Sequence, residues 1–222
     1  MGLIHRLMGG RAGLILGAVL LLLASPLLAP QLLAFPYKQQ TAIGTIWSEE
    51  PLSTEMIAQT VHDTQALLTR TPLATASESR PIFITNGGWR WQWVANRSAD
   101  AFAITRPFSS AVVVNRTDER TGLVDNGRPV GGERALSEVL AHEFTHGLIY
   151  RNYGIARAIR FPDWKVEGYA DHVAGRSTLD AEEVERLEAE GSDHPAISYF
   201  QSRQRVERIL RANGGSPDAL FE

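Results

Sequence analysis

The chain has 222 residues, a formal net charge of −3 and 44% hydrophobic residues. This length suits one ordinary domain with a buried core, and the composition excludes a wholly disordered chain. The slightly acidic balance argues against a nucleic-acid-binding protein, which would carry clustered excess Lys and Arg. Cysteine is absent, so disulfide scaffolds and cysteine-based metal sites are excluded, and any metal ligands are His, Asp or Glu.

The N-terminal segment, residues 1–37, is predicted to be a membrane anchor. No charged residue occurs between Ala12 and Tyr37. A helix needs about 20 apolar residues to cross the hydrocarbon core of a bilayer. We therefore expect one transmembrane helix over residues 12–35, and this helix would also be the chain's contact with the membrane.

The charges in front of this helix predict its orientation. His5, Arg6 and Arg11 precede it, and the positive-inside rule then leaves the N-terminus cytoplasmic. The remainder would lie on the exported, periplasmic side of a single-pass inner-membrane protein. A cleaved signal peptide is the alternative, but cuts after Ala29 or Ala34 lack the small residue expected at the −3 position. An uncleaved signal anchor is favoured.

Residues 38–222 are predicted to form one α+β domain. A helix is expected from Ser53 to about Leu68, because apolar residues recur there at helical spacing. Short apolar runs bounded by turn residues predict strands. These runs cover residues 81–85, 101–105 and 111–115.

Three tryptophans alternate with other residues at Trp89, Trp91 and Trp93. In a strand they would share one face of a sheet. A packed sheet face is the favoured interpretation, because aromatic side chains on strands are usually part of the core. A substrate platform or a membrane-facing belt is the alternative.

The C-terminal part, from Gly132 onward, is predicted to be helical. Periodic apolar residues, proline at helix starts and glycine after helix ends mark the boundaries. The expected helices cover residues 133–151, 162–175, 180–191 and 195–213.

The first of these helices contains His142-Glu143-Phe144-Thr145-His146, which fits the pattern H-E-x-x-H. Residues four apart lie on one face of a helix, about 6 Å apart along its axis, so both imidazoles can reach one ion. Zinc lowers the pKa of a water toward about 7, and Glu143 is placed to take the proton. We therefore predict Zn²⁺ ligands at His142 and His146, and a catalytic general base at Glu143.

A catalytic zinc takes three protein ligands and keeps one open position. Ile149 and Asn152 exclude the metzincin continuation, which needs Gly and His at these places. Glu167 and Asp171, four apart on the next helix, are better candidates. Glu167 is the predicted third metal ligand, and Asp171 is predicted to accept the second ring N–H of a zinc-bound histidine. Gly168 is expected to let the two helices approach closely.

Together, HEFTH and EGYAD resemble the gluzincin metallopeptidases, and the W-x-x-E-G-x-A run is similar to the bacterial peptidase MA-like branch. The resemblance covers about residues 101–215. It implies a zincin-like fold, in which a small antiparallel or mixed sheet packs on an active-site helix that C-terminal helices follow. It also implies an edge strand that binds substrate as an added strand, with 111–115 as the candidate. The chain departs from the branch at Asp171-His172, where many members carry a Tyr nearby.

A hydrogen-bond donor for the oxyanion is also expected, because water attack on a peptide carbonyl leaves a negative oxygen. Tyr199 is favoured, since it lies near the start of the last helix. The other candidates are His172, His194, Tyr150 and Tyr169.

These observations predict an exported, membrane-anchored zinc peptidase that acts on a peptide or protein substrate. One alternative is a non-catalytic zinc-binding or protein-interaction module on the same scaffold. Another is a membrane-tethered interaction protein in which HEFTH is accidental. The presence of all five site residues favours the enzyme, because a degenerate site usually loses its glutamate first.

Overall fold

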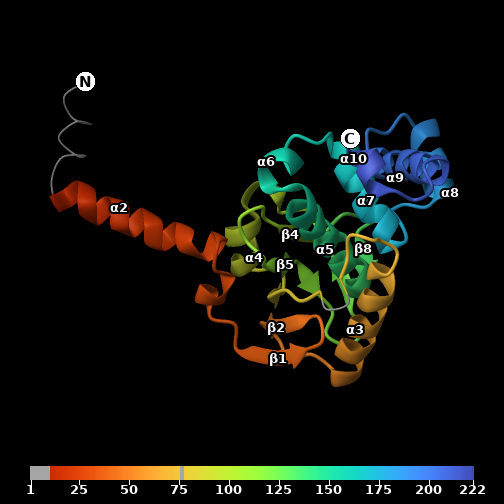
Figure 1. Ribbon diagram of the computed structural model, residues 1–222. Helices are drawn as coiled ribbons and strands as arrows, with labels where there is room; N and C mark the ends of the chain where they lie inside the picture. Colours follow the sequence, from red (N-terminus) through yellow and green to blue (C-terminus); the bar gives the residue numbers. More distant parts are fainter. Residues whose placement is uncertain (1–10, 76–77) are drawn as a thin grey trace.

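The computed structural model describes residues 11–75 and 78–222. It is an α+β structure in which a mixed sheet lies between helices, as Figure 1 shows. The elements of the first half are α2 (Arg11–Ala24), η1 (Ser25–Leu27), η2 (Pro30–Leu33), β1 (Tyr37–Thr41), β2 (Gly44–Ser48), α3 (Thr54–Leu68), β3 (Ile82–Ile84), α4 (Trp89–Ala95), η3 (Asn96–Ser98), β4 (Ala103–Thr105) and β5 (Val112–Val114). Those of the second half are β6 (Arg116–Thr117), β7 (Leu123–Asp125), β8 (Glu133–Ala135), α5 (Leu136–Tyr153), α6 (Ile155–Ala158), α7 (Asp163–Ala174), α8 (Ala181–Ala189), α9 (Pro195–Ala212) and α10 (Pro217–Phe221).

The main sheet has the strand order β1-β2-β3-β5-β4. β1 and β2 form an antiparallel hairpin, β2, β3 and β5 run parallel, and β4 returns antiparallel to β5. β5 is therefore an interior strand. The expectation that residues 111–115 form the substrate-binding edge is wrong, because β4 occupies that edge of the sheet.

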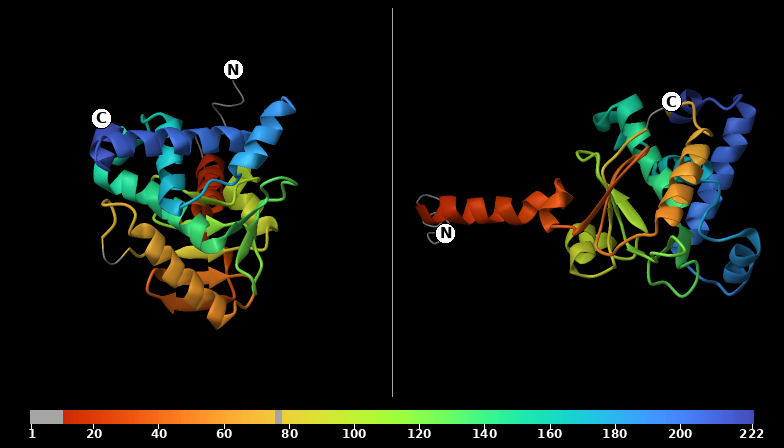
Figure 2. Two further views of the ribbon diagram at one scale, coloured as in Figure 1. Left: turned by 90° about the vertical axis from the view of Figure 1, so that its right-hand side faces the viewer. Right: turned by 90° about the horizontal axis from the view of Figure 1, so that it is seen from below.

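Side-chain alternation along the strands separates two cores. Ile82 and Ile84 of β3 pack with residues of α3 and α5, whereas Phe83 packs on the opposite face with Trp91 of α4. The same division holds for β5, where Val113 joins the α4 side. Figure 2 shows the result in its right-hand view. The sheet is a layer with α4 and the C-terminal end of α2 on one side, and α3, α5 and α9 on the other.

The strand predicted for the three tryptophans is wrong, because these residues form the short helix α4. Trp91 is only 1% exposed, while Trp89 and Trp93 are exposed. A helix rotates by about 100° per residue, so positions 89 and 93 share one side and position 91 points the other way. The buried indole of Trp91 donates a hydrogen bond to the carbonyl of Ala99 over 2.8 Å. Tertiary packing on the sheet thus outweighs the strand propensity of the tryptophans.

The transmembrane helix predicted over residues 12–35 is also wrong. In the part of the chain that the structure describes, no helix is both long and apolar enough to cross a membrane. α2 has 14 residues, about 21 Å of helix, against a hydrocarbon core of about 30 Å. The α-helix stops at Ala24 because Pro26 and Pro30 follow, and the segment continues as two 3-10 turns.

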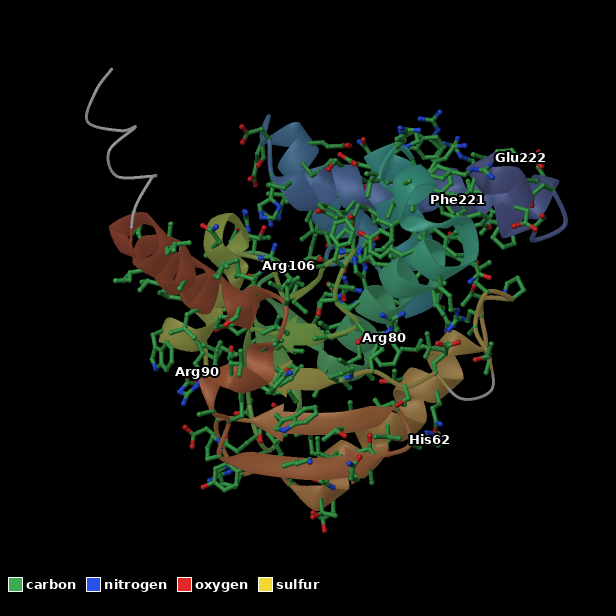
Figure 3. The ribbon with its side chains drawn as sticks, turned by 60° about the vertical axis from the view of Figure 1, so that its left-hand side comes forward. His62, Arg80, Arg90, Arg106, Phe221 and Glu222 are labelled. Atoms are coloured by element: carbon green, nitrogen blue, oxygen red, sulfur yellow. The ribbon has the colours of Figure 1, made fainter. Side chains whose placement is uncertain are left out.

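The single-pass localisation predicted from that helix is corrected with it. His5 and Arg6, on which the predicted orientation rested, lie outside the described residues. α2 projects away from the domain in Figure 1. The segment that follows α2 is attached to the domain through Arg90. The guanidinium of Arg90, labelled in Figure 3, donates to the carbonyl of Leu33 over 2.8 Å and pairs with Glu49 over 2.7 Å.

α7 and α9 approach closely at Gly168. A Cβ at this position would lie 2.5 Å from the carbonyl oxygen of Ser202 and 2.9 Å from a methyl carbon of Val206. The close neighbour is α9, whereas the sequence pointed to the active-site helix. The missing side chain thus holds α7, which carries Glu167 and Asp171, firmly against the last long helix.

Gly168→Ala is expected to destabilise the protein by about 1–3 kcal/mol, because the new methyl group overlaps backbone atoms of α9. In an exposed helix the same change would be favourable by about 1 kcal/mol. Gly17 in α2 has nothing within 4 Å of a built Cβ, so Gly17→Ala is the matched control and should leave the melting temperature unchanged or raise it slightly. Thermal unfolding followed by circular dichroism measures both, and equal stability of the two variants would contradict the packing argument.

Candidate metal centre

The active-site helix α5 follows directly from β8. The helix predicted over residues 133–151 therefore starts three residues too early, because residues 133–135 pair with β7 before α5 begins at Leu136. Leu140, Phe144 and Leu148 recur every fourth residue and are fully buried against the core. This apolar stripe fixes the rotation of the helix, and the same rotation turns His142 and His146 toward the cleft described below.

Three ligating atoms meet beside α5. Nε2 of His142 and Nε2 of His146 are 3.1 Å apart, and Oε2 of Glu167 on α7 lies 3.3 Å from the first and 3.8 Å from the second. Within residues 11–75 and 78–222, this is the one group of three or more His, Cys, Asp or Glu placed to hold a metal ion. The structure brings together the three residues that the sequence predicted as ligands.

The spacing fits a tetrahedral zinc. Zinc bonds of about 2.0–2.1 Å put two ligand atoms of one tetrahedron about 3.3 Å apart. The three observed separations bracket that value, and two nitrogens with one carboxylate oxygen are a donor set that zinc accepts. His142, His146 and Glu167 therefore fit this metal, with a fourth position left to the cleft.

The orientation of His142 supplies an independent argument. Its Nδ1 lies 2.9 Å from Oδ1 of Asp171, a residue only 1% exposed. A buried carboxylate accepts, so Nδ1 carries the proton and donates it. In the neutral ring, Nε2 would then turn a lone pair toward the oxygen of Glu167. This contact is unfavourable unless a positive charge lies there, and a second proton on His142 or a bound metal ion supplies that charge.

The electrostatics of these groups agree with that need. Burial alone would lower the pKa of His142, but its hydrogen bonds to Asp171 and Glu167 outweigh this effect and raise the pKa to about 10. Burial would raise the pKa of Asp171, yet the charge of Arg134 and the bond from His142 lower it to about 2. Burial opposes ionisation of Glu167 as well, but the charge of His146 and the hydrogen bond to His142 lower its pKa. Both carboxylates are therefore ionised at neutral pH.

His142, His146 and Glu167 line a cleft of about 600 Å³ between β4, α5, α7 and the start of α9. Glu143 lines the cleft and is only 7% exposed. Its backbone carbonyl accepts a hydrogen bond of 3.3 Å from the hydroxyl of Thr105, which links the edge strand β4 to α5. The predicted base thus faces the same space as the predicted metal ligands.

The candidates for the oxyanion donor divide into two groups. Tyr199, Tyr150 and His194 line the cleft. His172 and Tyr169 do not: His172 faces Glu207 at 3.6 Å, and the buried hydroxyl of Tyr169 meets that of Thr71 at 2.6 Å. His194 also caps α9, since its Nδ1 accepts the backbone N–H of Ala196 over 3.2 Å.

Both cleft tyrosines keep their protons at neutral pH. Burial raises the pKa of Tyr150, and the nearby charges of Glu143 and Glu167 raise it further. Burial also raises the pKa of Tyr199, with contributions from Glu167, Asp171 and Glu143. Each hydroxyl is therefore a hydrogen-bond donor within the electrostatic reach of the predicted site.

Two features of the candidate site were not predicted. Arg134 contacts Asp171 from β8, but a single arginine eight residues before His142 belongs to no motif. β4 forms the cleft edge, and only the strand order of the folded sheet reveals this.

No family model matches the sequence, and neither a curated protein nor a solved structure matches it.

The full chain is expected to bind one zinc ion through the three ligating residues. His146→Ala should remove the bound metal, because two protein ligands remain. His62→Ala is the matched control, since the His62 side chain is 78% exposed on α3 and should not affect metal content. Metal analysis after dialysis against a weak chelator measures this, and a His146→Ala variant that still holds one zinc would exclude the assigned site.

Proposed function

We propose that this protein is a zinc-dependent peptidase of the gluzincin type, in which HEFTH supplies two ligands and the base and Glu167 the third ligand. The observation that carries the proposal is the convergence of His142, His146 and Glu167 on one point of the cleft, with Glu143 beside them. The resemblance of the two motifs to that family agrees with this arrangement. The motifs by themselves would show neither the common point nor the open cleft.

Zinc bound by these ligands would act as a Lewis acid and bring the pKa of a water toward about 7. The chain's own residues do the rest. Glu143 is the general base that accepts the proton of the attacking water, and it can then deliver the proton to the leaving amine. Asp171 holds the ring of His142 in a fixed orientation. The buried position of Glu143 keeps competing bulk water away from the proton transfer.

The edge strand β4 offers a place for an extended peptide. The carbonyl of Phe102 accepts the backbone N–H of Asn115 beyond the end of β5. Residues of an antiparallel pair alternate in direction, so the N–H and C=O of Ala103 point away from β5. Ala103 lines the cleft. A substrate added as a further strand would therefore lie across the face of α5 that carries the site.

The lining of the cleft is mixed in chemistry. Apolar side chains come mainly from the segment between α5 and α7 and from α7 itself, and polar or charged side chains come mainly from the loops before and after β4 and around β8. The apolar group is Ala158, Ile159, Phe161 and Val166, and the polar group is Asp100, Asn126, Arg128 and Thr178. A cleft of this volume, with both apolar and polar side chains in its lining, suits a short peptide segment.

Glu143→Gln separates the peptidase from the non-catalytic alternative. Glutamine keeps the shape of the side chain but cannot take a proton, so kcat should fall about 10²–10⁴-fold. Zinc content should stay at the wild-type level, because Glu143 is not a ligand. Digestion of a peptide library by the zinc-loaded protein is the measurement. Zinc binding without hydrolysis by the wild type would favour the binding module, and equal hydrolysis by the variant would refute the role of Glu143.

Tyr199→Phe tests the oxyanion donor. Loss of one such donor lowers kcat by about 10²–10³-fold. KM should change little, because the bond forms chiefly in the transition state. Tyr150→Phe is the matched control, since it removes a phenol hydroxyl of the same kind from α5, which lines the same cleft. A larger loss of kcat in Tyr150→Phe than in Tyr199→Phe would assign the role to Tyr150 instead.

A further inference from the structure

Arg134 is a buried arginine directly behind the metal ligands. It lies in β8, and its side chain is 5% exposed. Its Nη1 donates to Oδ1 of Asp171 over 3.1 Å, and its Nη2 donates to the backbone carbonyl of Arg176 over 3.0 Å. One guanidinium thus joins β8, the aspartate of α7 and the turn that ends α7.

Asp171 receives two donors on one oxygen. Its Oδ1 accepts from Nη1 of Arg134 at 3.1 Å and from Nδ1 of His142 at 2.9 Å. The carboxylate is 1% exposed, so water cannot replace either donor. Rotation of this carboxylate would turn the ring of His142 with it. The direction of Nε2 toward His146 therefore depends on what fixes Oδ1, and Arg134 is the charged group that does so.

Arg134 is itself held in place from its other side. Its Nε lies 4.0 Å from Oε2 of Glu138 on the first turn of α5, and its guanidinium carbon lies 6.0 Å from the ring centre of Phe102. In the described part of the chain, neither Nε of Arg134 nor Oε2 of Glu138 has a hydrogen-bond partner. Arg134 thus lies between two carboxylates, Glu138 on one side and Asp171 on the other, and Asp171 in turn contacts His142.

We propose that Arg134 is a positioning residue of the metal centre, which acts through Asp171 to hold the His142 ring with Nε2 aimed at the metal position. The proposal rests on the metal site assigned above but not on peptidase activity. Groups that bond directly to a metal ligand, as Asp171 does to His142, commonly change metal affinity by about 10–100-fold, and removal of the charge that holds such a group is expected to have an effect in this range. A buried ion pair that only stabilises the fold would change stability and leave the affinity of the folded protein alone.

The first test is zinc affinity of the full chain, measured by competition with a chromogenic chelator. Arg134→Met keeps the bulk of the side chain and removes its charge and donors, and it should weaken zinc binding about 10–100-fold. The zinc affinity of Arg134→Lys should lie between those of Arg134→Met and the wild type. The matched control is Arg128→Met, because Arg128 lines the same cleft but pairs with Asp100. Wild-type affinity in both Arg134 variants, with folding confirmed by circular dichroism, would overturn the proposal.

A double-mutant cycle tests the route of the effect. If Arg134 acts through Asp171, Arg134→Met in an Asp171→Asn background should weaken zinc binding by less than about threefold more. An undiminished further loss would overturn the proposed route. If Arg134→Met fails to fold, Arg134→Lys carries the same comparison. The absorption spectrum of bound Co²⁺ should also change in the Arg134 variants and not in Arg128→Met, because it reports ligand geometry.

The outcomes separate this proposal from the proposed function. Zinc binding that depends on Arg134, in a protein that hydrolyses no peptide, would support the positioning role and refute the peptidase. Hydrolysis with zinc affinity independent of Arg134 would do the reverse. A wild-type protein that binds no zinc would overturn both.

Discussion

The packing of α7 against α5 is the constraint on which the candidate site depends. His142 and His146 belong to one helix and Glu167 to the other, so a shift of about 1 Å between the helices would take the ligand atoms out of the range that one zinc ion accepts. The buried contact from His142 to Asp171 is the bond that joins the two helices at this point. The proposed metal binding therefore depends on the relative position of α5 and α7.

The rest of the fold keeps the two helices in place from three directions. The sheet packs against α5 through the apolar stripe that includes Phe144. α9 presses on α7 where Gly168 leaves no side chain between them. Phe161 on the cleft wall packs on Phe221 of α10, at 4.8 Å between ring centres, and Figure 3 shows Phe221 in the helical half of the molecule. The candidate site is therefore built largely on packed helices, and β4 is the sheet edge that borders it.

The ligand set could be predicted from the sequence because helical periodicity converts spacing into geometry. Residues four apart must share a face, so both histidines and the pair Glu167 and Asp171 were identifiable. Features that depend on tertiary arrangement were not. The alternating tryptophans of α4 and the apolar run before Pro26 each matched a local pattern that packing or a helix break overruled. The roles of β4 and Arg134 come from strand order and from contacts between distant residues, which no local pattern encodes.

The short path between the ligands has a consequence for the life of the protein in a cell. Only about twenty residues separate His146 from Glu167, so an ion that joins them closes a short loop, for which the entropic cost is small. If the proposed site holds zinc, this ion would link α5 and α7 at little cost in chain entropy. An ion bound to the folded form but not to the unfolded chain shifts the folding equilibrium toward the native state. The abundance of intact protein would in that case follow the supply of free metal, and a shortage would act first as a shortage of folded chains.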